Sequence, residues 1–515
     1  MDGAKLVTVA QRKTRVKTAT TPGPTKLPPL AKSFFIRIAR RSIASFASAA
    51  FVWLSRASWA CCVAVALSSL PLAASAQIAN SEALVDLMAK PGGAGVGALF
   101  SSERSPYKGA GQRSDVQPVY LYEGERFFLR SDRAGVKFAP FEDQALDLYL
   151  RHRVAGYPLD DPPPSLEGLA THSGGTDLGL TWRLRFGSSQ AYASLYQNIN
   201  NPHGQQLDVG AFTDWMSGAW TLRPAAWLAW RSSRVNNFYF GVPPEAATPE
   251  RPSYQPGAGV DASAALYVSY QLTEGWRLVG GVSATRYSST VRASPIVESG
   301  TQVGAVLGAT YSLGADEVRK TATSSPTWVR VLYGQAVEDR CDIIDIMVLR
   351  CTSIDHAAPT EIYGFSLGKT LLENLNGWPL DFVGYVNVIL HNDRPFQKDG
   401  VELDVFLKAF FRGFPWSDRV LTRLGFGWGL SWSDPVPQAE NSEQASRHRR
   451  TSRLLNYIEP SIDISLGDVF SKPDWKQTFL GLSITHRSGM FGNSQMLGRV
   501  DGGSNYLTVY AEHPF

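Results

Sequence analysis

Four polar residues near the end of the chain have the types and spacing of an ester-hydrolysing site. His486 and Ser488 are two residues apart, so an extended strand would place both side chains on one face. A serine hydroxyl becomes a nucleophile when an imidazole takes its proton, and the imidazole needs an acceptor that fixes its tautomer. Asn505 could orient the ring through its carbonyl oxygen, and Asp501 is the nearest carboxylate that could replace it. These residues form the candidate catalytic set.

Two antiparallel strands, over residues 476–488 and 504–515, are predicted to carry this set. Leu480, Leu482 and Ile484 alternate with small polar residues, as a membrane barrel with an apolar outside and a polar inside requires. His486 and Ser488 share the parity of these apolar residues, so we expect them to face lipid. At a strand rise of about 3.3 Å per residue they would stand roughly 30 Å up, near the far rim of the apolar band.

The composition favours membrane strands over membrane helices. The chain has 515 residues, 44% hydrophobic and 19% charged, with 14 Trp, 19 Tyr and 46 Gly. Few apolar runs are long, as expected of a barrel with aromatic girdles. The net charge of +4 owes much to the basic N-terminus, so no nucleic-acid partner is expected. The predicted location is the outer membrane of a Gram-negative cell.

Residues 1–76 have the pattern of a signal peptide with an extended basic front. Arginines precede the apolar stretch 60–72, and Ala74-Ser75-Ala76 has the small-x-small form that signal peptidase accepts, so cleavage is predicted after Ala76. A transmembrane anchor is the weaker alternative, because the apolar core is shorter than the ~20 residues needed to span a bilayer. Residues 77–91 are expected to be a linker.

Two cysteines, Cys341 and Cys351, remain in the mature chain, with nine residues between them in a predicted loop. Outside the cell such a pair is expected to form a structural disulfide. No nearby His or Cys completes a ligand set, so neither a metal nor another cofactor is expected.

Residues 92–314 contain Gly-rich strands separated by turns, about ten to twelve by a loose count. In residues 259–272, for example, Val260, Ala262 and Leu266 alternate with Asp261 and Tyr267, which is typical of a barrel hairpin. Several phrases in this part resemble the MipA/OmpV family of outer-membrane proteins. They are Ser105-Pro106-Tyr107-Lys108-Gly109, Tyr122-Glu123-Gly124-Glu125-Arg126-Phe127-Phe128, Asn236-Asn237-Phe238-Tyr239-Phe240-Gly241-Val242, Glu245-Ala246, Tyr254 with Gly257-Ala258-Gly259, and Ser294-Pro295-Ile296-Val297.

The resemblance implies a β-barrel that acts as an envelope scaffold, with a lytic transglycosylase and a murein synthase as partners. It offers no catalytic residues to transfer. The stretch from Asn236 to Val242 could be a recognition loop, but Asn-Asn followed by aromatics and Gly more often indicates a tight turn with an interfacial anchor.

Residues 315–326 break the strand pattern with charge, Ser, Thr and Pro, so we expect a second linker. Eight strands follow in residues 327–515, at 328–335, 360–370, 378–391, 400–412, 419–432, 453–466, 476–488 and 504–515. Lys408, Glu459 and Asp463 are among the inward residues, so acids and bases can pair in the lumen. Eight strands enclose a packed interior and no pore.

This eight-stranded part, ending in Phe515 with His486-x-Ser488 near the top of its seventh strand, resembles the lipid A 3-O-deacylase (PagL) family. The resemblance implies His486 as general base, Ser488 as nucleophile and lipopolysaccharide as the lipid. The chain departs from the family at Asn505, where the family has Glu, and at Gly489, where the family has Asn.

The sequence therefore predicts an all-β protein of transmembrane antiparallel barrels, a MipA/OmpV-like part followed by an eight-stranded PagL-like barrel. Whether the parts close separately or share one larger wall is left open, although the linker favours two barrels. An envelope scaffold is the leading functional hypothesis. Hydrolysis of lipid A or phospholipid esters at His486 and Ser488 is the alternative.

Overall fold

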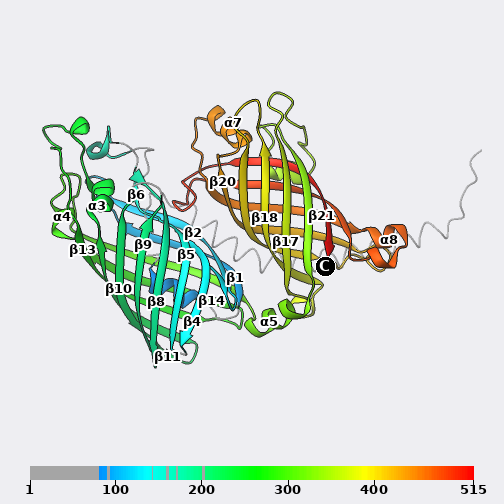
Figure 1. Ribbon diagram of the computed structural model, residues 1–515, viewed down its shortest axis with the longest axis horizontal. Coiled ribbons are helices and arrows are strands. Elements are labelled where there is room, and N and C mark those ends of the chain that lie inside the picture. Colours follow the sequence, from blue (N-terminus) through cyan, green and yellow to red (C-terminus); the bar gives the residue numbers. More distant parts are fainter. Residues whose placement is uncertain (1–80, 90–92, 142, 158–161, 170–171, 200–202) are drawn as a thin grey trace, which may run out of the picture. The chain divides into compact units, whose positions relative to one another are not determined.

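The computed structural model describes residues 81–515 except 90–92, 142, 158–161, 170–171 and 200–202. The predicted signal peptide and its cleavage site lie outside these residues. The described chain forms two closed antiparallel barrels, which answers the question of one wall or two (Figure 1). Within the described residues, no helix combines the length and apolar character needed to cross a bilayer.

Twelve strands close the first barrel within the described chain, the upper end of the predicted count. Pairing of β1 with β15 and of β10 with β12 completes the ring, and short β11 pairs with β12 beyond the end of β10. The twelve strands of the ring are β1 (Ala94–Arg104), β2 (Gln112–Glu123), β3 (Phe127–Arg130), β4 (Arg133–Phe141), β5 (Gln144–His152), β8 (Thr176–Phe186), β9 (Ser189–Asn198), β10 (Gln205–Thr213), β12 (Trp220–Arg231), β13 (Gly259–Gln271), β14 (Trp276–Arg286) and β15 (Thr301–Leu313), and β11 spans Trp215–Ser217.

Strict alternation along each strand separates the lipid face from the lumen. In β13, Tyr267 is fully buried in the lumen while the neighbouring Leu266 is 43% exposed on the outside. Apolar side chains such as Leu228 and Leu307 continue the outer band on other strands. The outside can be apolar because it meets hydrocarbon, and the inside must be polar or filled.

Long connections lie at one end of this barrel and short turns at the other. The long ones carry β6 (Gly156–Tyr157), β7 (His172–Ser173), α3 (Ser233–Phe240), α4 (Ser289–Arg292) and the 3-10 turns η2 (Pro164–Leu166) and η3 (Pro244–Ala246). Residues 236–240 therefore belong to helix α3, and the expected tight turn is wrong for them. Figure 1 shows α3 and α4 at the same end of the barrel.

Helices occupy parts of both stretches that the sequence suggested as linkers. Within residues 77–91, α2 (Glu82–Met88) begins at Ser81, whose hydroxyl accepts a hydrogen bond from the Leu84 amide. Within residues 315–326, α5 (Ala315–Ser324) precedes the second barrel. Charged and small residues fit a short helix as well as a linker, so composition alone does not separate the two.

Eight strands close the second barrel, as predicted, with β16 paired to β23. They are β16 (Thr327–Ala336), β17 (Glu361–Leu372), β18 (Leu380–Asn392), β19 (Gly400–Phe411), β20 (Thr422–Asp434), β21 (Leu454–Ser465), β22 (Phe479–Ser488) and β23 (Gly503–Pro514). Their connections carry α6 (Ile343–Met347), η4 (Leu375–Gly377), α7 (Gln438–Ser446), α8 (Leu466–Phe470) and η5 (Pro473–Trp475).

A buried ionic network fills the lumen of the second barrel. Arg330 contacts Glu459 at 2.7 Å and Glu512 at 2.9 Å, and Lys408 also contacts Glu459. Arg423 joins Glu512 at 2.7 Å. These side chains come from five strands and each charge meets an opposite one, so the interior is a packed core, as the sequence predicted.

Candidate functional site

The sequence motifs of the first barrel that resemble the family lie together in one structure, a cap that the long connections build. The Tyr107 hydroxyl donates to the Tyr239 carbonyl at 3.0 Å, and the Tyr107 ring stacks on Phe240 at 5.6 Å. Tyr107 also forms a β-bridge with Val297. Residues more than 180 positions apart in the sequence are thus joined at the end of the barrel where the long connections lie.

Further hydrogen bonds from the same phrases close the cap. The Ser294 hydroxyl donates to the Phe240 carbonyl at 2.6 Å, and the Asn236 amide donates to the Gly257 carbonyl at 2.8 Å. The Tyr254 hydroxyl donates to the Thr290 carbonyl at 2.8 Å. Each of these polar side chains satisfies a backbone carbonyl, so the phrases hold loops together. In this structure, the side chains of these motifs hold the loops of the cap in position.

Helix α2 lies inside the lumen and is anchored by arginines from four strands. Glu82 contacts Arg133 of β4 at 2.6 Å and also Arg183 of β8. Arg223 of β12 donates to the Ala83 carbonyl and pairs with Asp86, at 2.8 and 2.9 Å, and Arg277 of β14 donates to the Leu87 carbonyl at 2.5 Å. The helix therefore acts as a plug that is held at both of its ends.

Charge complementarity around the plug is strong. Burial by itself would raise the pKa of Glu82, but the guanidinium groups of Arg183 and Arg133 lower it to about 2. The apolar side of α2 packs against a collar of buried lumen residues that includes Leu99, Val119 and Tyr267. The plug thus combines an ionic latch with apolar packing.

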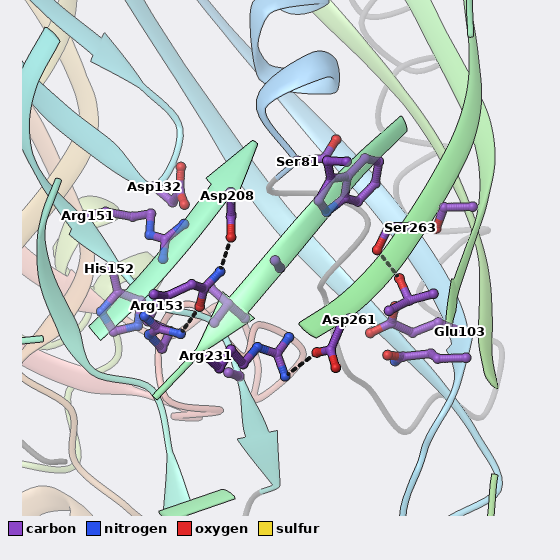
Figure 2. Close-up of a pocket in the computed structure, with 18 residues that line it drawn as sticks. Ser81, Glu103, Asp132, Arg151, His152, Arg153, Asp208, Arg231, Asp261 and Ser263 are labelled. Atoms are coloured by element: carbon purple, nitrogen blue, oxygen red, sulfur yellow. Dashed lines mark hydrogen bonds and ion pairs between the residues drawn. The ribbon is translucent and has the colours of Figure 1, made fainter. Parts of the chain in front are cut away.

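Between the plug and the cap, the lumen retains a polar chamber of about 110 Å³ (Figure 2). Ser81 at the start of α2 lines it, and a smaller cavity of about 30 Å³ extends beneath Tyr107 and Tyr239 of the cap. The charged side chains that line the chamber come from β1, β5, β10, β12 and β13, from the turn between β3 and β4, and from the residue that follows β5. They are Glu103, Asp132, Arg151, Arg153, Asp208, Arg231 and Asp261.

In the second barrel, the structure places His486 and Ser488 on the outward face of β22, the face that parity predicted. His486 is paired with Asn505 in the antiparallel register of β22 and β23. The ring Nδ1 lies 3.1 Å from the Ser504 carbonyl, so Nδ1–H donates to it, and the Asn505 amide nitrogen donates to the Cys341 carbonyl at 3.1 Å. The Asn505 side chain also contacts the ring, so backbone and side chain together orient it.

A loop covers this outward patch, so His486 is buried and does not meet lipid. Residues 337–360, between β16 and β17, carry α6 and the disulfide between Cys341 and Cys351, whose Cα atoms are 5.4 Å apart. Cys341 and Ile346 pack on Ile484, next to His486 on the same face. The prediction that His486 lies on the outward face of its strand is therefore correct, but the prediction that its ring meets lipid is wrong.

The other two members of the candidate set are not joined to His486. Among the residues that the structure describes, no hydrogen bond links the His486 ring to the half-buried Ser488 hydroxyl. Asp501 instead pairs with Arg449 at 2.8 Å. The described residues also contain no group of three His, Cys, Asp or Glu side chains placed to hold a metal.

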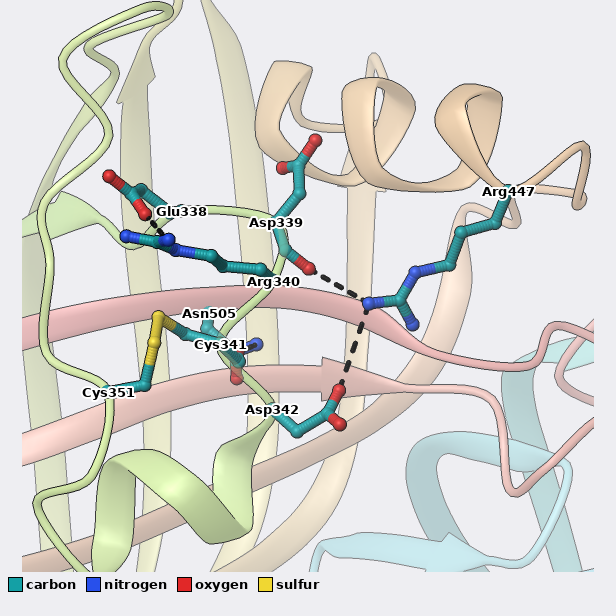
Figure 3. The surroundings of a disulfide bond; sticks show 8 residues. All are labelled: Glu338, Asp339, Arg340, Cys341, Asp342, Cys351, Arg447 and Asn505. Atoms are coloured by element: carbon teal, nitrogen blue, oxygen red, sulfur yellow. Dashed lines mark hydrogen bonds and ion pairs between the residues drawn. A yellow bond between two sulfur atoms is a disulfide. The ribbon is translucent and has the colours of Figure 1, made fainter.

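The disulfide loop is itself tied to α7 (Figure 3). Arg447, which follows the last residue of α7, donates to the Asp339 carbonyl at 2.8 Å. It also contacts Glu443 of α7 at 3.2 Å. Burial raises the pKa of Glu443 to about 7, and the nearby carboxylates of Asp339 and Asp342 raise it further against the effect of Arg447. These contacts hold the loop of residues 337–360, which covers His486, against α7.

Sequence reasoning missed the plug and the chamber. The signal was present in the inward parity of Arg133, Arg183 and Arg223, three arginines on strands of a barrel too wide to be filled by its own side chains. An excess of inward cations predicts an acidic partner within the lumen, and Glu82 and Asp86 of α2 provide it.

Closed antiparallel rings, apolar outer bands and polar interiors define an outer-membrane β-barrel protein. The chain belongs to the family described as MltA-interacting protein MipA, which matches residues 95–313, the whole of the first barrel from β1 to β15. This confirms the MipA/OmpV resemblance and the outer-membrane location. The likeness of the second barrel to the lipid A 3-O-deacylase family stays a prediction.

Three relatives illustrate the match. Outer membrane protein Omp26La of Vibrio anguillarum is 31% identical over 193 residues, 36% of this chain and 74% of that protein. Outer membrane protein OmpV of Vibrio cholerae is 28% identical over the same shares. The MltA-interacting protein of Escherichia coli is 25% identical over 239 residues, 44% of this chain and 89% of that protein.

Proposed function

We propose that this outer-membrane protein is an envelope scaffold that binds a lytic transglycosylase and, through it, a murein synthase. The observation that carries the proposal is the alignment of the first barrel with nearly the full length of a protein named for its interaction with MltA. The structure adds that the family-like phrases build a cap and that α2 fills the lumen. Both features suit a stable platform.

The short-turn end of the first barrel is the surface proposed for the partner. In outer-membrane barrels the short turns face the periplasm, where murein enzymes act. At this end Met216, the middle residue of β11, is 75% exposed, beside the exposed Trp215 and Trp220. An exposed apolar tip of this kind suits contact with another protein. The outer apolar bands are proposed to contact lipid, including lipopolysaccharide.

Affinity purification of the tagged full chain from outer membranes in mild detergent tests this proposal. We expect a lytic transglycosylase to be retained by the wild-type chain and lost with Met216→Asp. Leu349→Asp is the matched control, because Leu349 is equally exposed, at 81%, on the disulfide loop of the other barrel. The proposal fails if the wild-type chain retains no transglycosylase, or if Met216→Asp retains it as well as the control.

Ester hydrolysis by the second barrel stays a prediction that rests on its resemblance to the lipid A 3-O-deacylase family. The shared face of His486 and Ser488 favours it, whereas the cover and the missing hydrogen bond between them oppose it. We expect Ser488→Ala to leave the 3-O-acyl content of lipid A unchanged in mass spectra of cells that express the chain. A fall in 3-O-deacylated lipid A with Ser488→Ala, but not with Ser471→Ala outside the site, would establish the hydrolase.

A further inference from the structure

The chamber of the first barrel contains charges that its own walls leave incompletely matched. Arg151 and Arg153 both pair with Asp177, at 2.6 and 3.0 Å, which occupies them. Arg231 pairs with Asp261 through one terminal nitrogen at 3.0 Å. Arg231 lines the chamber and is 9% exposed. Its Nε atom is buried and has no hydrogen-bond partner.

Asp208 lies near this arginine and near Arg151 and Arg153, but it forms an ion pair with none of them. Asp208 of β10 accepts a hydrogen bond from the Gln206 amide at 2.8 Å. Within the described parts of the chain, no Lys, Arg or His nitrogen lies within the 4.0 Å that defines an ion pair with its carboxylate. Figure 2 shows Asp208 and Arg231 on neighbouring strands around the chamber. A buried donor without a partner and a buried carboxylate without a direct ion pair are both costly unless something satisfies them.

We propose that the chamber binds a small zwitterion of the α-amino-acid type, with its ammonium group at Asp208 and its carboxylate at Arg231 Nε. Such a molecule satisfies both groups at once. It also brings no net charge into the lumen, and each of its two charges meets an opposite charge there, which offsets the cost of taking both out of water.

The strand register fits this ligand class. Arg231 is paired directly with Gln206, so Asp208 is its diagonal neighbour on the same face. Diagonal neighbours across antiparallel strands stand about 7–8 Å apart. The two side chains therefore enter the lumen close enough together for one small molecule to reach both. The chamber volume of about 110 Å³ admits a molecule of that size but no large solute.

Calorimetric titration of the full chain in detergent micelles tests the proposal with glycine, L-alanine and D-alanine as probes. Acetate and methylamine are the matched half-ligands, since each carries only one of the two charges. We expect at least one amino acid to bind at least about tenfold more tightly than either half-ligand, because only it makes both charge-assisted contacts.

Two substitutions locate the site. Asp208→Asn keeps the shape of the side chain and should weaken amino-acid binding at least about tenfold while leaving acetate unchanged. Arg286→Gln is the control, because Arg286 is exposed on β14 and does not line the chamber. Heat-modifiable mobility in gels shows that each variant is a folded barrel. The proposal is overturned if no amino acid binds more tightly than acetate and methylamine, or if Asp208→Asn binds like wild type.

Discussion

Replacing Glu82 by Gln should release the plug of the first barrel. Removing one partner of a buried ion pair typically costs about 3–5 kcal/mol, because the remaining charge is left uncompensated. Here Arg133 keeps Asp132 at 2.9 Å and Arg183 keeps Asp147, so we expect the lower end, about 3 kcal/mol. That loss raises the population with α2 undocked roughly a hundredfold, since each 1.4 kcal/mol is a factor of ten.

A buried thiol reports the undocked population. Ala83 is fully buried in α2, so Ala83→Cys reacts with a maleimide only when the helix leaves the lumen, whereas Cys341 and Cys351 are blocked by their disulfide. We expect Glu82→Gln to speed labelling roughly a hundredfold where docking is fast relative to reaction. The exposed Glu250→Gln is the matched control.

The pH dependence provides a second check on the latch. The pKa of Glu82 in the folded protein is lowered to about 2, below its ordinary value of 4.5. The stabilisation by this carboxylate is therefore complete above pH 4.5 and is lost as the pH falls through about 2. Labelling of Ala83→Cys, divided at each pH by the rate of an exposed thiol, should not change between pH 7 and pH 5. If Glu82→Gln labels at the wild-type rate, apolar packing alone holds the plug, and the ionic account is refuted.

Three further outcomes are expected. Glu459→Gln should lower the free energy of unfolding of the second barrel by about 3–5 kcal/mol in urea titrations, because Arg330 and Lys408 both lose a buried carboxylate partner; an unchanged midpoint would contradict the network. The pKa of Glu443 is raised to about 7, so ionising it costs stability, and the α7 amides, measured against their intrinsic exchange rates at each pH, should be better protected at pH 5 than at pH 8 in wild type but equally protected in Glu443→Gln. Replacing both Cys341 and Cys351 by Ser should loosen the cover by about 2–3 kcal/mol and speed reaction of His486 with diethyl pyrocarbonate; equal rates would show that packing alone holds the cover.

The membrane made the barrel strands predictable from sequence. Hydrocarbon on one side and a polar lumen on the other force a period of two, and a shift by one residue would turn every side chain to the wrong face. The predicted strand at 400–412 is therefore observed as Gly400–Phe411, and the one at 504–515 as Gly503–Pro514. The same rule gave the correct face for His486.

The contents of the lumen and the cover over His486 follow no such period. Helix α2 has seven residues, and its Glu82 and Asp86 look like linker residues until the arginines around them are known. Likewise, the contact of Cys341 with Asn505 joins residues 164 positions apart, which only tertiary packing decides. Sequence spacing therefore located the candidate site on its strand but could not show that a loop occupies the space above it.

The widths of the two barrels explain why the charges of the ionic network in the second barrel are paired with one another and those around the chamber of the first barrel are only partly paired. Eight strands leave room only for side chains, so Arg330, Lys408, Glu459 and Glu512 come close enough to satisfy one another and no cavity is needed. Twelve strands enclose more space than wall side chains can fill. That lumen therefore takes in a helix and a cap, and it still keeps a chamber where Arg231 and Asp208 are only partly matched. Ligand binding inside a lumen is thus expected of the first barrel, whereas any chemistry of the second must take place on its outer surface.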